Sequence, residues 1–361
     1  MTLFSIASIM LVIRKSYQFV HFLLLLLLVA LLIIACQNLP IEAPTSIELR
    51  DSTSDCRLVK HEMGETKVCG QPQRVAVLSP HILDSILSLG VQPFAYATDG
   101  LLNLKKFDQP KKQIPYLGNY VTSQPINVGD RKNPSLELLA KIKPDLILSE
   151  AWLAKEKYDL LSQISPTLLF SYFGPDDQKD WRYDIEGIAK ALGREDKAKE
   201  LLTRYPDQIS TVRDQLASVV AAHPRVLCIS TDNLASTIYL EEDYTVTRLL
   251  QEVGFKIVSP QNSSLVPGNN MQISIEVLPQ VETDLIFVMA WSNNNLKNPQ
   301  EKVKQQWVKN PLLKQLPAFK NGHMFFVDYF IWGGVTRGPI ADGLILEQLP
   351  QLLNPLNEES G

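Results

Sequence analysis

Hydrophobic and polar residues follow the same order in two stretches of the chain, Ser135–Trp152 and Ser274–Trp291. Each stretch begins with a Ser and, two residues later, a Glu; apolar residues at helical spacing, an Asp, a short apolar run and a Trp follow. A Ser before a helix caps its free N–H groups, and a Glu in the first turn is favoured by the helix dipole. The unbroken apolar run indicates a strand buried on both faces, as in a parallel sheet. Each stretch therefore predicts a helix and a buried strand, with the Trp at the carboxyl end of the strand.

A second similarity precedes each of these stretches. Arg74–Ser79 reads RVAVLS, and Arg225–Ser230 reads RVLCIS. Chance similarity between helix–strand units is the alternative, but the matched order of two such units favours two lobes of similar plan. Ligands of open α/β sheets bind outside the carboxyl ends of the strands. We predict an α/β fold of two Rossmann-like lobes with the ligand cleft between them.

A long helical pattern lies between the two repeats. Residues 180–222 carry apolar side chains at helical spacing, and a break at Gly193 and a break or kink at Pro206 are expected. A surface helix of one lobe is the alternative, but the position midway between the repeats favours a single long connecting helix. The predicted domains are an N-terminal α/β lobe over 56–179, an interlobe helix over 180–222 and a C-terminal α/β lobe over 223–361.

The N-terminal residues have the pattern of a targeting segment. Residues 1–35 hold two charges, both positive, and end in a long apolar run. Cys36 follows directly, and Ile33–Cys36 resembles a lipobox, so we predict a lipoprotein signal peptide over 1–35 and lipidation of Cys36. An uncleaved transmembrane helix is the alternative. Residues 36–55 are expected to be a flexible tether, and the rest of the chain to lie in the periplasm or on the extracytoplasmic face of the cell membrane.

Two cysteines flank a predicted β-hairpin. Cys56–Cys69 has strand-like segments on either side of Met63-Gly64, which would form the turn. In an oxidising compartment a disulfide between Cys56 and Cys69 is expected, and two free thiols are the alternative. Cys228 lies in the middle of a predicted strand and is interpreted as a buried apolar residue.

The composition restricts the class of function. The chain has 361 residues, 45% of them hydrophobic, and a formal net charge of −4, which argues against a nucleic-acid partner. It contains no phosphate-binding G-x-x-x-x-G-K-[ST], no G-x-S-x-G nucleophile elbow and no H-E-x-x-H zinc motif. The histidines are scattered, and no pair has the spacing of metal ligands. We therefore expect a binding protein that is not an enzyme and has no metal site or cofactor of its own.

Aromatic and polar residues accumulate at the predicted strand ends, where they would line a binding cleft. Core packing is the alternative for each aromatic residue, and a hydrogen-bonded structural role is the alternative for His81. Arg131 and Arg337 belong to opposite lobes and could clamp an anionic ligand. The candidate ligand-binding residues are Ser79, His81, Arg131, Trp152, Tyr172, Trp291, Tyr329, Trp332 and Arg337.

Several short segments carry a resemblance to a known family through their order along the chain. They are Pro72–Leu78, Val128–Glu137, Lys143–Ile147, Ile273–Glu276, Asp284–Val288, Leu316–Gly322 and Arg337–Ala341. In this order they resemble the substrate-binding lipoproteins of the iron–siderophore and cobalamin ABC importers, and the resemblance covers about residues 56–354.

This resemblance implies two α/β lobes joined by one long helix, with the ligand between them. It also implies that Glu137 and Glu276, one in each lobe, face arginines of the membrane permease. The expected partners are a ferric siderophore, the ABC permease with its ATPase, and the membrane through the lipid anchor; the protein itself is expected to be a monomer.

Other functions remain open at this point. Cobalamin or haem could replace the siderophore, and a surface protein that binds a partner protein is a third class. A metallocluster enzyme of the nitrogenase type would need cysteine ligands, and Cys228 is the only cysteine outside the lipidation and hairpin sites. A bare metal ion would need several His, Asp or Glu ligands that converge.

Overall fold

The structure is a computed structural model that describes residues 55–102, 104–171, 180–234, 238–242, 245–260, 271–292, 298–333 and 338–358. Among these residues, no helix combines the length and the apolar character needed to cross a membrane. The predicted signal peptide, Cys36 and nearly all of the predicted tether lie outside the described residues.

The described chain starts with the predicted hairpin, strands β1 (Cys56–His61) and β2 (Gly64–Cys69). The antiparallel register pairs His61 with Gly64, so the turn is Glu62-Met63 and the prediction of Met63-Gly64 is wrong by one residue. Gly64 is the first residue of the second strand and has φ 110°, which a residue with a side chain rarely adopts. Cys56 and Cys69 are directly opposite each other and form a disulfide.

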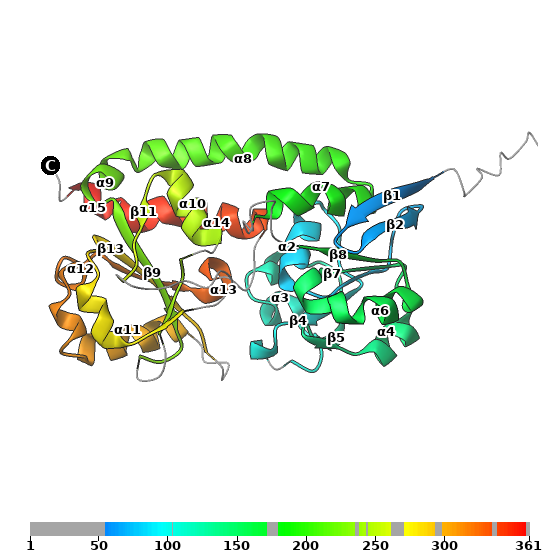
Figure 1. The fold of residues 1–361 in the computed structure, drawn as a ribbon, viewed down its shortest axis with the longest axis horizontal. Coiled ribbons are helices and arrows are strands. Elements are labelled where there is room, and N and C mark those ends of the chain that lie inside the picture. The colour runs from blue at the N-terminus through cyan, green and yellow to red at the C-terminus, as the bar shows by residue number, and fades with distance from the viewer. Residues whose placement is uncertain are drawn as a thin grey trace, which may run out of the picture. The chain divides into compact units, whose positions relative to one another are not determined.

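The N-terminal lobe is built on a six-stranded sheet in the order β6-β5-β4-β3-β7-β8, in which only β6 is antiparallel to its neighbour (Figure 1). Apolar residues on both faces of the sheet are buried, which explains the unbroken apolar runs. Helices α4 and α6 cover one face, and α2 and α7 cover the other. The strands are β3 (Val75–Val77), β4 (Ala95–Thr98), β5 (Ile126–Asp130), β6 (Asn133–Pro134), β7 (Leu146–Glu150) and β8 (Thr167–Phe170). The helices are α2 (Pro80–Ser88), α3 (Pro110–Gln113), α4 (Leu136–Ile142), α5 (Ala151–Ala154) and α6 (Tyr158–Ile164), with 3-10 turns η1 (Gly100–Leu102), η2 (Leu117–Tyr120) and η3 (Lys155–Lys157).

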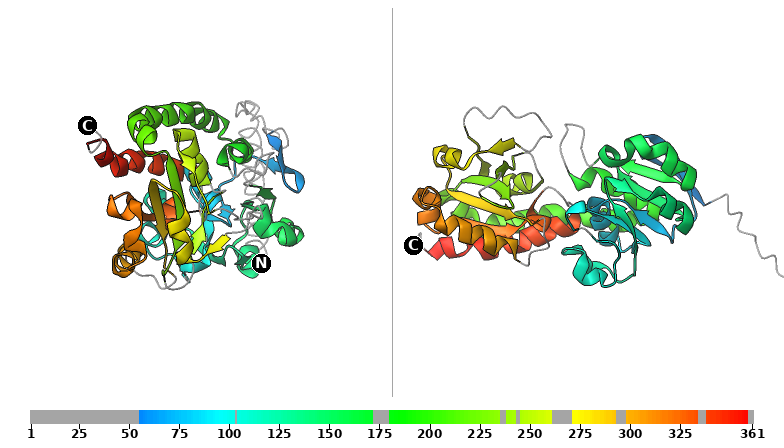
Figure 2. Two further views of the ribbon diagram at one scale, coloured as in Figure 1. Left: turned by 60° about the vertical axis from the view of Figure 1, so that its left-hand side comes forward. Right: turned by 90° about the horizontal axis from the view of Figure 1, so that it is seen from below.

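The C-terminal lobe is built on a second sheet, in the order β12-β10-β9-β13-β14, with β11 also paired to β9. Strands β11, β9, β13 and β14 are parallel, and β10 and β12 are antiparallel additions at one edge. Helix α11 packs on one face, and α10 and α14 pack on the other (Figures 1 and 2). The strands are β9 (Arg225–Thr231), β10 (Ile238–Leu240), β11 (Lys256–Ile257), β12 (Met271–Ile273), β13 (Leu285–Ala290) and β14 (Met324–Asp328). The helices are α10 (Thr245–Val253), α11 (Pro299–Lys309), α12 (Pro317–Lys320), α13 (Tyr329–Trp332), α14 (Pro339–Leu353) and α15 (Pro355–Glu358), with 3-10 turns η4 (Ile275–Gln280) and η5 (Leu313–Gln315).

The two lobes repeat one interaction at the level of single atoms. Asp145, which precedes β7, accepts a hydrogen bond from the backbone N–H of Arg74, which precedes β3, at 3.0 Å. Asp284, which precedes β13, accepts the backbone N–H of Arg225 in the same way at 2.8 Å. The aspartates therefore fix the register between the first and the repeated strand of each lobe. The prediction of two α/β lobes of similar plan is confirmed.

The predicted single helix over 180–222 is instead three consecutive helices, α7 (Trp181–Leu192), α8 (Glu195–Gln215) and α9 (Ala217–Ala222). Gly193 ends α7 in the left-handed conformation with φ 63°. Pro206 lies within α8 and does not end it; the whole helix has 21 residues and packs against α7, α10 and α14. The long connecting element is thus α8, and the break predicted at Gly193 is the real one.

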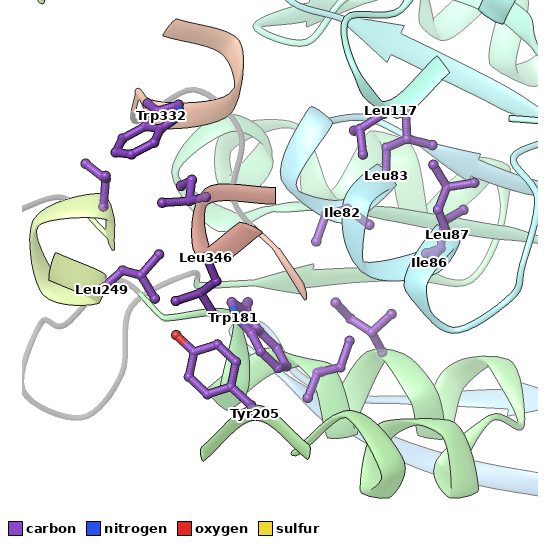
Figure 3. Close-up of a cluster of buried hydrophobic side chains, with 14 of the residues drawn as sticks. Ile82, Leu83, Ile86, Leu87, Leu117, Trp181, Tyr205, Leu249, Trp332 and Leu346 are labelled. Atoms are coloured by element: carbon purple, nitrogen blue, oxygen red, sulfur yellow. The ribbon is translucent and has the colours of Figure 1, made fainter. Parts of the chain in front are cut away.

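One apolar cluster joins elements that are distant in sequence (Figure 3). Ile82 and Ile86 of α2, Trp181 of α7, Tyr205 of α8 and Leu346 of α14 are buried in it. Helix α14 belongs to the C-terminal end of the chain but packs against α2 of the N-terminal lobe and against α8. This cluster packs α2 and α7 of the N-terminal lobe against α8 and α14.

Candidate ligand-binding site

Arg131 follows β5 at the carboxyl edge of the N-terminal sheet and is already paired. Its Nε lies 2.8 Å from Oδ2 of Asp99, the residue directly after β4, and the two side chains are 11% and 9% exposed. The Arg131 backbone N–H also donates to the carbonyl of Thr98 at 2.8 Å. Two neighbouring strand ends therefore fix the guanidinium before any ligand arrives.

Trp152 lies beside this arginine and is open to solvent. It is in the short helix α5 after β7, and 53% of the residue is exposed, although it is a large apolar residue. The Arg131 guanidinium is 5.4 Å from the centre of the Trp152 ring, within the range of a cation–π contact. The indole Nε1 donates to Oε2 of buried Glu150 at 2.5 Å, which orients the ring. An exposed aromatic surface with a fixed cation beside it can contact a bulky anionic ligand.

Ser79 and His81 lie inside the N-terminal lobe. Ser79 has no exposed surface, and its hydroxyl accepts the Ile82 N–H at 3.1 Å, so that it caps α2. His81 is 2% exposed, and its Nε2 lies 3.8 Å from Asp184 on α7. The structure does not bring either side chain to the exposed surface that Arg131 and Trp152 form.

Three aromatic rings meet at the strand ends of the C-terminal lobe. Trp291 directly follows β13, and its ring centre is 4.9 Å from that of Tyr329 at the start of α13. It is also 5.6 Å from the ring of Tyr239 on β10. Trp291 and Tyr329 are both half-buried, so part of each remains available for contact.

Trp332 is a core residue in the structure. It has no exposed surface, stacks on Phe287 at 5.1 Å between ring centres, and donates from Nε1 to Gln348 at 2.8 Å. The four-residue helix α13 turns Trp332 into the sheet and leaves Tyr329 beside Trp291. Trp332 therefore follows the alternative of core packing, and no part of it is exposed to contact a ligand.

Two of the predicted ligand residues, Tyr172 and Arg337, lie outside the described residues. The clamp between Arg131 and Arg337 therefore stays a prediction. Asp99 and Glu150 were not predicted, although each is a carboxylate at the end of a strand. A search for charged residues at the ends of the predicted strands would have found both.

The two glutamates of the repeats are exposed, but their local structures differ. Glu137 is in the first turn of α4, where the Ser135 hydroxyl accepts the Leu138 N–H at 3.2 Å as predicted. Glu276 is in the 3-10 turn η4, where the Ser274 side chain makes no cap and donates instead to Glu276. The prediction of a Ser-capped helix is therefore wrong for the second repeat, where Pro279 lacks the N–H that a longer helix would use.

Metal chemistry finds no support among the described residues. No group of three or more His, Cys, Asp or Glu side chains there is arranged to hold a metal ion. Burial raises the pKa of the Cys228 thiol, which keeps it protonated and a poor metal ligand.

Comparison with known proteins identifies the family of the chain. Residues 75–329 match the family model described as periplasmic binding protein. The putative ABC transporter substrate-binding lipoprotein YhfQ of Bacillus subtilis is 31% identical over 300 residues, 81% of this chain and 86% of that protein. The Fe(3+)-citrate-binding protein YfmC of the same organism is 28% identical, over 78% of this chain and 82% of its own.

Solved structures extend the comparison to the whole fold. Staphylococcus aureus SirA complexed with staphyloferrin B has a TM-score of 0.66 and 26% identity, and the match covers 82% of this chain and 98% of SirA. Bacillus subtilis FeuA complexed with ferri-bacillibactin has a TM-score of 0.64 at 20% identity, over 83% of this chain and 98% of FeuA, a likeness of fold alone. The order of the two sheets, the long helix α8 and the match over residues 75–329 lead to one conclusion: the chain belongs to the periplasmic binding protein family of ABC importers.

Proposed function

We propose that the protein captures a ferric siderophore outside the cytoplasmic membrane and delivers it to an ABC permease. The observation that carries the proposal is the exposed Trp152 with the fixed guanidinium of Arg131 beside it. Relatives named for ferric citrate and for staphyloferrin B support a siderophore rather than cobalamin or haem.

The charges and the exposed ring of the site favour a bulky chelate over a small anion. Asp99 lies 2.8 Å from the Arg131 guanidinium, so the positive charge of the arginine is largely compensated. A single carboxylate would gain little there, whereas a bulky chelate can combine hydrogen bonds to the guanidinium with contact to the Trp152 ring. In the proposed complex, Trp291 and Tyr329 contact the opposite side of the chelate.

Delivery requires contact with the membrane and the permease. We infer that Cys36 carries a lipid and that Glu137 and Glu276 dock on the permease. Both glutamates are exposed, and they lie at matched positions of the two repeats. A permease with two similar halves could engage both at once, which makes the contact bivalent. The same chain supplies Arg131 with Trp152 and Trp291 with Tyr329, so the proposed site is complete in a monomer. Capture and delivery of the ligand involve no catalytic step.

Tryptophan fluorescence of the full chain, purified in detergent, tests the proposal. The panel consists of ferric citrate, a ferric hydroxamate, a ferric catecholate, haem and cobalamin. Trp152 is 53% exposed while Trp181, Trp307 and Trp332 are buried, so quenching by a ferric chelate should fall sharply in Trp152→Phe.

The control for this experiment is Trp307→Phe, because this ring is buried in the core under α11. A ferric chelate should quench the fluorescence of this variant as strongly as that of the unmodified protein. If no ferric chelate quenches, or if Trp152→Phe binds as before, the assignment of the site is wrong. If only haem or cobalamin gives saturable quenching, the proposal that the ligand is a ferric siderophore is wrong.

A further inference from the structure

Asp84 of α2 makes its hydrogen bonds across a very long sequence separation. Its Oδ1 accepts the backbone N–H of Ile340 at 2.9 Å, and its Oδ2 accepts that of Ala341 at 2.9 Å. Oδ2 also accepts the hydroxyl of Tyr116 at 3.1 Å. Asp84 itself is fully buried. A carboxylate of the N-terminal lobe therefore binds the first turn of α14, a helix of the C-terminal lobe.

The first N–H groups of a helix have no partners within the helix and usually receive them from the side chain of the N-cap residue. The N-cap of α14 is Gly338, which has no side chain to offer. Asp84 supplies the missing acceptor, and its negative charge is favoured by the dipole of a 15-residue helix. Helix α14 is thus capped by a residue from another lobe.

Gly338 is small because Asp84 comes so close. Its φ of 176° is extended backbone that any residue adopts, so conformation alone does not require glycine there. A Cβ at this position would lie 2.3 Å from Oδ1 of Asp84, a distance at which one of the two must move. The contact therefore depends on both residues, and each can be tested from its own side.

The surroundings leave little freedom at this junction. His81, one turn before Asp84, faces Asp184 of α7. On α14 itself, Asp342 accepts from Trp181 Nε1 at 2.8 Å and from Tyr205 at 3.1 Å. The cavity nearby, lined by Pro80, Tyr116 and Phe330 among others, has about 10 Å³ of free space, the room of about one water molecule.

We propose that Asp84 is the residue that positions the C-terminal lobe against the N-terminal lobe, by capping α14 from outside. Helix α13, which carries Tyr329, lies directly before the segment that leads into α14 and packs against α14. Asp84 thereby sets the distance between the Trp152 side and the Tyr329 side of the site. Only this last consequence, for ligand binding, rests on the proposed function.

Distance measurements between spin labels test the positioning role without any ligand. Labels at Lys141→Cys on α4 and Lys309→Cys on α11 report the separation of the lobes, and both positions are exposed. Cys228 is buried, Cys56 is in a disulfide with Cys69, and Cys36 is replaced by Ser in every labelled chain. The doubly labelled chain that retains Asp84 should give one narrow distance population at pH 7.5. Asp84→Asn keeps the shape but turns one acceptor into a donor facing a backbone N–H, and the narrow population should be lost.

Asp145→Asn is the matched control. Asp145 also accepts two backbone N–H groups, those of Gln73 and Arg74, but all three residues are in one lobe. This variant should lower the melting temperature and leave the interlobe distance unchanged. The proposal is overturned if Asp84→Asn keeps the narrow population, or if Asp145→Asn broadens it to the same extent.

Gly338→Ala approaches the same contact from α14 and covers the case in which an Asp84 variant does not fold. As a single substitution, Gly338→Ala should broaden the interlobe distance distribution. In a chain that already carries Asp84→Ala it should broaden the distribution less, because two of the three nearest atoms that the new Cβ would meet are then gone. Purely additive effects of the two substitutions would contradict a direct contact and with it the proposal. Because no siderophore is present, these outcomes are independent of the fluorescence panel.

Discussion

The guanidinium of Arg131 shares its surroundings with two carboxylates. Asp99 contacts it directly, and Glu150 orients the Trp152 ring on which it lies. The side chain therefore loses little conformational freedom when a ligand binds, because that freedom is already lost in the free protein. This preorganisation is the reason to expect a large effect from one substitution.

Arg131→Ala should weaken siderophore binding about tenfold or more, since a hydrogen bond to a charged group contributes roughly 1.5–3 kcal/mol. Arg131→Lys keeps the charge but loses the planar guanidinium, so its siderophore affinity should lie between those of the unmodified protein and Arg131→Ala. Fluorescence titration measures both. Arg204→Ala, an exposed arginine on α8, serves as the control and should bind normally. Unchanged affinity in Arg131→Ala would remove this residue from the site.

Asp84 gives a prediction about pH. Burial raises its pKa from 3.8 to about 6, and the hydrogen bonds from Ile340, Ala341 and Tyr116 oppose the shift. The folded chain therefore holds a proton between about pH 4 and 6 that the unfolded chain has released. As the pH rises through this range, the free energy of unfolding should fall by roughly 3 kcal/mol on account of this group, at about 1.4 kcal/mol for each pKa unit.

Asp84→Asn removes this titration, so the difference in stability between the variant and the unmodified protein should change with pH. The unmodified protein should lose stability relative to the variant as the pH rises from 4 to 7. Urea unfolding at four pH values in this range measures the difference. A difference that is constant with pH would mean that Asp84 titrates as it does in the unfolded chain.

At the scale of single elements, the two repeats share a sequence pattern but not a helix. The first forms α4 with a Ser135 cap, and the second forms the 3-10 turn η4. Ser135→Ala should lower the free energy of unfolding by about 1 kcal/mol, because it removes the acceptor of the Leu138 N–H.

Ser274→Ala should cost clearly less than Ser135→Ala, since the Ser274 side chain makes no cap. Parallel denaturation curves of the two variants make the comparison. Equal losses would indicate that the hydrogen bond from the Ser274 hydroxyl to Glu276 stabilises the protein as much as the Ser135 cap does.

At the scale of the whole molecule, the exposed glutamates separate transport from binding. Glu137→Ala combined with Glu276→Ala should leave siderophore affinity unchanged and sharply lower uptake by cells, because the proposed bivalent contact with the permease is lost. Uptake of labelled ferric siderophore, together with titration of the purified variant, measures the two effects. The exposed Glu156→Ala with Glu301→Ala, away from the repeats, is the control pair. Normal uptake by the double variant would mean that the two glutamates do not contact the permease. Loss of siderophore binding would mean that they belong to the ligand site.

Local patterns decided much of the fold from the sequence alone. The apolar runs before Trp152 and Trp291 predicted buried parallel strands, and Ser135 and Glu137 predicted a capped helix start; the structure has both. These signals act over a few residues, so they survive without knowledge of the rest of the chain. The same signals were misleading where a neighbour intervened, as Pro279 does in the second repeat. The break expected at Gly193 does separate α7 from α8, whereas Pro206, the other expected break or kink, lies within α8 and does not end it.

The sequence by itself determined the duplication and the two lobes, and it predicted candidate ligand residues at the carboxyl ends of the strands. Only the tertiary structure decided which of these side chains remain exposed there. Ser79, His81 and Trp332 follow strands as Trp152 does, yet they are buried, because helix packing turns them into the core. The tertiary structure also chose the partners: Asp99 for Arg131, and Asp84 for an amide 256 residues away. Burial and pairing depend on residues brought together by the complete fold, whereas periodicity and capping depend on neighbours along the chain.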